Sequence, residues 1–142
     1  MIEPILVRLH GLVQTRLNEL AQTGNKVKSM FDIVFKMEEE TAKREKAADN
    51  LIVLARERSG AEMLFKADVI PKIVRFLKVE KSRNIRLSLI RVMGELAKKD
   101  VDRAKAVIAE AGIPYFLDAL NTHDEETVTA ASYVIQVQKS AN

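Results

Sequence analysis

The chain has 142 residues, which is long enough for one domain with its own hydrophobic core. It contains no cysteine, so a disulfide framework and thiolate metal sites are excluded. Its 23 Lys and Arg residues against 20 Asp and Glu leave a net charge of +3, which is too small by itself to indicate nucleic-acid binding.

The first stretch of the chain is apolar but interrupted by charge. Glu3, Arg8 and His10 lie among the apolar residues of positions 1–13 and spoil both a signal-peptide core and a membrane span. We therefore expect a soluble, cytoplasmic protein with no membrane partner and no nucleic-acid partner.

Residues 1–24 predict one long amphipathic entry helix. Apolar residues recur at helical spacing from Ile2 to Leu20, and Gly24 is a suitable stop just past the end. An apolar stripe must be covered if the helix is to persist in water, so we expect it to pack near Val27, Phe31 and Val34.

The rest of the chain repeats itself. Residues 65–77 align with residues 108–120, both with Ile-Pro at a helix start, at Pro71 and Pro114. The helices that follow, at residues 87–96 and 128–137, repeat at an offset of 41 residues. A period of this size with three helices per unit is typical of armadillo repeats, whose apolar faces are buried by stacking on neighbouring units.

The predicted fold is therefore an all-α, armadillo-like helical solenoid of about three repeats preceded by the entry helix. We place the units at residues 25–59, 60–100 and 101–142. Two capping-box pairs, Ser59 with Glu62 and Thr122 with Glu125, support these boundaries. The residues expected in the core are Leu51, Leu54, Ile73, Leu77, Leu89, Ile90, Met93, Leu96, Phe116 and Leu120.

Three segments suggest a family: residues 44–57 (REKAADNLIVLARE), 59–62 (SGAE) and 112–116 (GIPYF). They resemble the central region of the animal myosin chaperones of the UCS class (Unc-forty-five type), over about residues 30–137. The resemblance implies an armadillo-like region between a TPR domain that recruits Hsp90 and Hsp70 and a UCS domain that binds myosin. Neither outer part is found in the sequence, so we expect a fragment that acts as a rigid spacer in a myosin-folding co-chaperone.

Nothing in the sequence points to an enzyme. His10 and His123 are far apart, and the glycines are isolated, so neither a metal or acid–base site nor a phosphate-binding loop is predicted. The serines lack a nucleophile-elbow context. The run at residues 38–40 (EEE) fans out around a helix or lies in a solvated loop. We expect no catalytic residue, no metal and no cofactor.

Two surfaces could bind a protein, which is the alternative function. A basic ridge between Lys72 and Arg91 has Glu80 as its one acid, and could bind an acidic segment. A polar stripe on the third helix of each unit could line a groove for an extended peptide, although it lacks the asparagines and tryptophans of peptide-binding armadillo proteins. The candidate protein-binding residues are Lys72, Arg75, Arg86, Ser88, Arg91, Glu95, Lys98, Ser132 and Gln136.

The final helix carries apolar residues on more than one face. Half of this set can pack back onto Leu89, Met93 and Leu96, whereas Tyr133 and Val137, or their neighbours, would then face water as an apolar patch. We expect the chain to self-associate through this end.

Overall fold

A computed structural model describes residues 10–15, 29–98, 100–119 and 125–141. Short helices lie at residues 10–15 and 29–34. The remaining helices are α2 (Thr41–Arg56), α3 (Arg58–Lys66), α4 (Val69–Leu77), α5 (Arg83–Ala97), α6 (Val101–Ala109), α7 (Ile113–Ala119) and α8 (Glu125–Ala141). The described residues contain no β-strand, and the predicted all-α class is confirmed.

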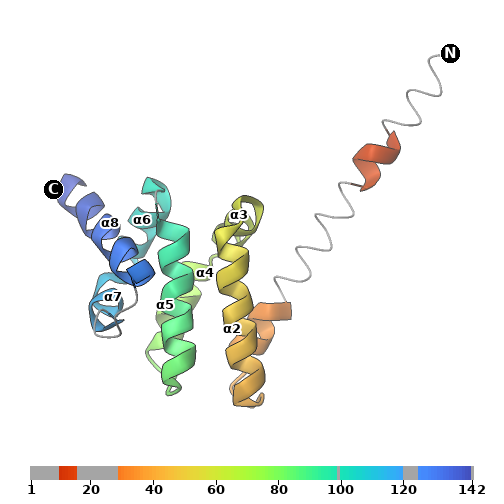
Figure 1. Cartoon of the computed structure of the whole chain (residues 1–142), viewed down its shortest axis with the longest axis horizontal. Helices are drawn as coiled ribbons and strands as arrows, with labels where there is room; N and C mark the ends of the chain where they lie inside the picture. The colour runs from red at the N-terminus through yellow and green to blue at the C-terminus, as the bar shows by residue number, and fades with distance from the viewer. Residues whose placement is uncertain (1–9, 16–28, 99, 120–124, 142) are drawn as a thin grey trace.

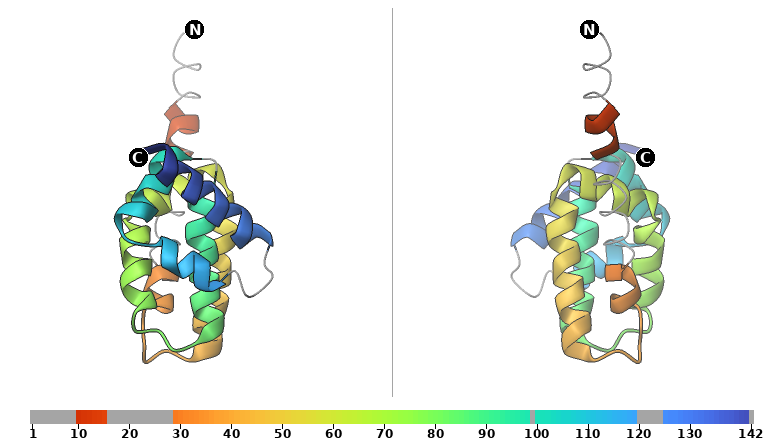
Figure 2. Two further views of the ribbon diagram at one scale, coloured as in Figure 1. Left: turned by 90° about the vertical axis from the view of Figure 1, so that its left-hand side faces the viewer. Right: turned by 90° about the vertical axis from the view of Figure 1, so that its right-hand side faces the viewer.

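The helices form an armadillo-like solenoid, as predicted. The triplets α3–α4–α5 and α6–α7–α8 repeat one plan of two short helices and a longer third one. The long helices α2, α5 and α8 follow one another along the stack, and the shorter helices form the layer behind them (Figure 1). Figure 2, which views the stack along its length, shows the two layers. Because each long helix packs on the next, the hydrophobic core is continuous from one unit to the next.

The predicted core is confirmed for every residue that the structure describes. Each expected side chain that the structure describes is buried, and Leu120 lies outside the described residues. The repeated Ile-Pro pairs also lie where the sequence placed them. Pro71 is in the first turn of α4 and Pro114 in the first turn of α7, where a missing N–H leaves no bond unmade.

The turn before each Ile-Pro helix has a left-handed residue at the same repeat position. Asp68 (φ 57°) and Ala111 (φ 58°) both stand three residues before the proline. Asp tolerates this conformation better than Ala, because its short polar side chain can hydrogen-bond locally. Ala111 is therefore a strained position in an exposed turn.

The predicted capping box at Ser59 is wrong. α3 begins at Arg58, and its N-cap Glu57 makes no side-chain cap hydrogen bond. Thr122, the other predicted cap, lies outside the described residues. The observed caps are Ser82, which accepts from the N–H of Ile85 at 3.4 Å, and Asp100, which accepts from the N–H of Arg103 at 3.0 Å.

The predicted packing of the entry helix is not observed in its described part. Residues 10–15 are helical, but Val13 is 58% exposed, although the apolar stripe placed it inward. Phe31 and Val34, the expected docking residues, are buried. The Phe31 ring lies 5.9 Å from that of Phe35 and beneath the ammonium of Lys72. The rest of the predicted helix, and Val27, lie outside the described residues.

No described helix combines the length and the apolar character that a membrane span requires.

Candidate functional site

The third helices of the three units present their polar stripes side by side. Between α2 and α5, Ser88 Oγ donates a hydrogen bond of 2.8 Å to Asp49 Oδ1. Arg56, at the C-terminal end of α2, donates through Nε to Glu95 Oε1 at 3.3 Å. It also donates through Nη2 to Glu126 Oε2 at 2.7 Å. One guanidinium therefore connects α2, α5 and α8.

This connection is possible because α8 lies close to α5. A Cβ built on Gly94 of α5 would lie 3.0 Å from the Cβ of Ala130 on α8. A larger residue than glycine there would push α8 away and move Glu126 with it. The hydrogen bonds that Arg56 donates to Glu126, and secondarily to Glu95, raise the pKa of Arg56 above its ordinary value.

The other predicted stripe residues lie in different surroundings. Arg91, Glu95 and Lys98 line a shallow depression between α5 and the start of α8. Ser132 is exposed on α8, whereas Gln136 lines a groove at the end of the stack. Part of the stripe is thus engaged in hydrogen bonds between helices. On α8 the stripe divides, because Ser132 is exposed and Gln136 lines the groove.

The basic ridge is only partly a surface feature. Arg75 is exposed, and Lys72 lies with its Nζ 5.5 Å from the centre of the Phe31 ring. Arg86 instead donates to the backbone carbonyls of Leu77 and, at 3.2 Å, Glu80. It therefore satisfies one carbonyl group at the end of α4, where backbone oxygens lack helical partners, and one in the turn that follows.

A buried ion pair beside this ridge was missed by the sequence analysis. The guanidinium of Arg44, on α2, forms an ion pair with the carboxylate of Glu80, and both residues are about 95% buried. Arg44 Nε also donates to the carbonyl of Val34 at 3.0 Å, and its guanidinium lies 5.6 Å from the centre of the Phe76 ring. The second carboxylate oxygen of Glu80 accepts from the N–H of Ser82 at 3.3 Å.

Two signals in the sequence could have revealed this pair. Arg44 precedes Ala47, Ala48 and Leu51 at the spacing of a buried helix face, so it occupies a core position. A buried arginine needs a carboxylate, and Glu80 is the one acid in the basic segment of residues 72–91.

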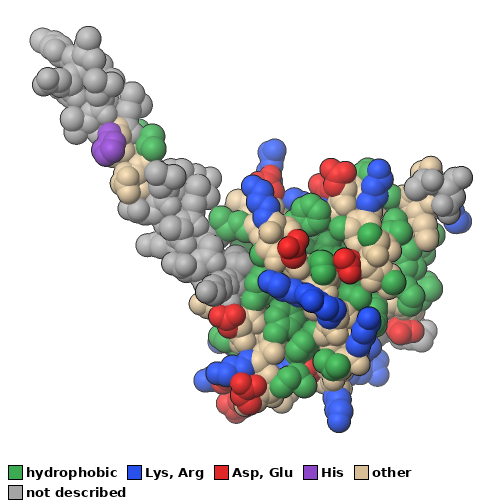
Figure 3. Space-filling view, turned by 180° about the vertical axis from the view of Figure 1, so that it is seen from behind, with side chains coloured by type: hydrophobic (Ala, Val, Ile, Leu, Met, Phe, Trp, Pro, Cys, Tyr) green, Lys and Arg blue, Asp and Glu red, His purple; other side chains and the backbone are tan. Residues whose placement is uncertain are grey.

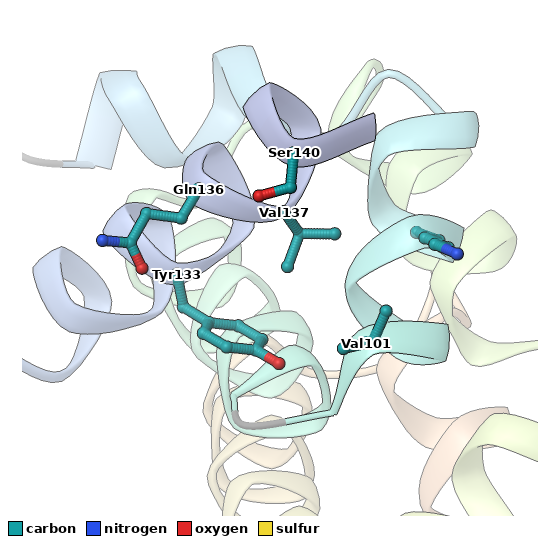
Figure 4. Close-up of a pocket in the computed structure, with 6 residues that line it drawn as sticks. Val101, Tyr133, Gln136, Val137 and Ser140 are labelled. Carbon is teal, nitrogen blue, oxygen red and sulfur yellow. The ribbon is translucent and has the colours of Figure 1, made fainter. Parts of the chain in front are cut away.

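At the C-terminal end of the stack lies an open groove of about 400 Å³ between α6 and α8. Its walls are Val101, Lys105, Tyr133, Gln136, Val137 and Ser140. In Figure 4 the side chains of Tyr133 and Val137 project from α8 toward the side on which Val101 lies. Within α8, Ala130, Ala131 and Val134 are buried, while Val101 across the groove is 49% exposed.

The described residues offer no arrangement that would hold a metal ion. Among them, no group of three or more His, Cys, Asp and Glu side chains is close enough to do so. Arg44, Arg56 and Arg86 instead bind carboxylates or backbone carbonyls of other segments, which is what residues that fix helices in place do.

The comparisons with known proteins agree with the architecture. No protein-family model matches the chain. It is 36% identical over 131 residues to protein unc-45 homolog B of Danio rerio and 33% identical over 131 residues to that of Xenopus tropicalis, which is 92% of this chain in each case. The human protein unc-45 homolog B is 29% identical over 134 residues, or 94% of the chain.

The chain spans only 14% of the length of each of these relatives. A solved structure, UNC-45 from Drosophila melanogaster, matches with a TM-score of 0.66 and 36% identity, over 82% of this chain and 15% of that one. The resemblance found in the sequence is therefore confirmed, and so is the armadillo-like solenoid fold.

Proposed function

Because the chain is a homologue of the UNC-45 proteins over a segment of them, we propose that it is a non-catalytic scaffold of a myosin-folding co-chaperone. In this proposal it fixes the distance and angle between a part that recruits Hsp90 and Hsp70 and a part that binds myosin. Those partners are engaged by regions other than this chain, and the setting is the cytoplasm.

The observation that carries the proposal is the way that polar contacts connect successive units. Arg56 joins three long helices, and Arg44 with Glu80 joins α2 to the turn before α5. Hydrogen bonds with defined donors and acceptors fix orientation more strictly than apolar contact alone, because apolar contact is not directional. The contacts thus favour one angle between units.

A graft tests this function. The segment of Danio rerio unc-45 homolog B that matches this chain is replaced by the chain, or by a flexible Gly/Ser linker of the same number of residues. Folding of a myosin motor is then assayed. The scaffold proposal expects the chain to support folding and the linker to fail, since a flexible linker sets neither distance nor angle. Equal folding with the linker would overturn the proposal.

The alternative function, capture of an extended peptide on the third-helix stripe, is supported less well. Asp49 with Ser88, and Arg56 with Glu95, are already hydrogen-bonded to each other. A peptide would have to replace these bonds before gaining its own, which lowers the net free energy of binding.

A further inference from the structure

The turn between α4 and α5 carries positive charge that no described carboxylate neutralises. Arg75, Lys78, Lys81 and Arg83 are all exposed. Within the described part of the chain, none of these four side chains forms an ion pair or a hydrogen bond. We refer to these four cations, together with Val79 between them, as the basic patch.

Burial of the neighbouring acid creates this patch. Glu80 lies in the middle of the same turn, yet it is 5% exposed and its carboxylate binds Arg44. The Glu80 carboxylate therefore does little to neutralise the positive potential of the exposed cations around it. Lys72 is left out of the patch because it lies against the Phe31 ring and shares a groove with Asp32.

Helix stability explains only half of the patch. Arg75 and Lys78 lie at the C-terminal end of α4, where cations are stabilised by the helix dipole. Lys81 and Arg83 flank the N-terminal end of α5, where cations are disfavoured, and the first turn of α5 has no acidic residue. Because these two cations destabilise the start of α5, helix stability does not explain their position.

The patch also has an apolar component. Val79 is 58% exposed between Lys78 and Lys81. On the face seen from behind in Figure 3, hydrophobic side chains lie among Lys and Arg side chains and also among Asp and Glu side chains. No aromatic ring belongs to the patch, whereas surfaces that bind single-stranded nucleic acid combine cations with stacking rings.

We propose that the basic patch docks an acidic segment of a partner protein. Carboxylates of the segment pair with Lys78, Lys81 and Arg83, and an apolar side chain packs on Val79. The proposal rests on the proposed function in one respect, that the chain works by positioning proteins, and it adds a surface of the chain itself that binds a further protein.

The probe is a fluorescent peptide of alternating Glu and Leu, titrated with the full chain by fluorescence anisotropy at low and at physiological salt. The patch variant is Lys78→Glu, Lys81→Glu, Arg83→Glu. We expect its Kd to be at least about tenfold higher than that of the wild type, because three attractive contacts become repulsive. Wild-type binding should weaken with added salt.

A matched variant, Lys46→Glu, Lys66→Glu, Lys139→Glu, changes the net charge equally at exposed sites elsewhere. Thermal unfolding followed by circular dichroism establishes that both variants fold. An equal loss of affinity in the matched variant would overturn the proposal, since net charge alone would then explain binding. So would tighter binding to phosphatidylserine vesicles or to polyuridylate than to the peptide.

The peptide titration does not depend on the rigidity of the chain, so its failure leaves the scaffold proposal intact. A failed graft likewise leaves the proposal for the basic patch intact.

Discussion

Arg44 and Glu80 form an ion pair that is almost completely buried between α2 and the turn that precedes α5. The pair is completed by the carbonyl of Val34 on one side and the N–H of Ser82 on the other. It therefore connects three segments of two successive units. Removing one partner leaves the other charge buried without compensation, whereas removing both removes the desolvation cost as well.

Glu80→Gln should therefore lower the free energy of unfolding by about 3–5 kcal/mol, because Arg44 keeps its charge and loses its carboxylate. The double variant Arg44→Met, Glu80→Leu should recover much of this loss. Urea denaturation of the wild type, Arg44→Met, Glu80→Leu and the double variant gives the coupling energy. Additive losses would contradict the idea that the two residues act as a pair.

Ala111→Gly should stabilise the chain by about 0.5–1 kcal/mol, because glycine adopts a positive φ without strain. Ala109→Gly is the matched control. Ala109 is exposed in α6, and glycine there should destabilise by a similar amount. Thermal unfolding distinguishes the two, and a loss of stability in both variants would show that Ala111 is not strained.

Leu96→Ala should cost about 2–5 kcal/mol, because Leu96 of α5 is fully buried in the hydrophobic core. Since the core runs through all units, the whole chain should unfold at a lower denaturant concentration in one transition. If Leu96→Ala unfolded at the same denaturant concentration as the wild type, the result would contradict a stacked core.

The groove between α6 and α8 should support self-association, since Val101, Tyr133 and Val137 present apolar surface to water. Light scattering over a concentration series should show a rising average mass. Val101→Glu should return the chain to a monomer without unfolding it, because Val101 is half exposed. Val134 is unsuitable for this test, since it is fully buried and a charge there would disrupt the core. A wild type that stays monomeric at all concentrations would contradict the prediction.

The repeat plan and the core could be predicted from the sequence because they follow from apolar spacing, which is local information. The Ile-Pro pairs at Pro71 and Pro114 fixed the alignment of two units. The contacts between units could not be predicted in the same way. Arg56 and Glu126 are 70 residues apart, and whether they meet depends on how α8 crosses α5.

The errors have physical causes as well. The Ser59 cap failed because α3 starts immediately after α2, so Ser59 already lies inside the helix. Arg86 was assigned to a binding surface because its charge is visible in the sequence, whereas the two carbonyls that it satisfies are not. Charge patterns show which residues are polar but not which polar groups are already paired.

The spread of distances between the first and last long helices tests the central claim most directly. The chain has no cysteine, so spin labels at Lys46→Cys on α2 and Gln138→Cys on α8 report this distance alone. A pair on α5, at Asn84→Cys and Lys98→Cys, gives the width expected of one rigid helix with its cap. A rigid scaffold predicts a single α2–α8 distance distribution about as narrow as that of the α5 pair. This distribution should broaden in Arg56→Gln. A broad or multiple distribution in the wild type would show that the units move independently, and would contradict the account.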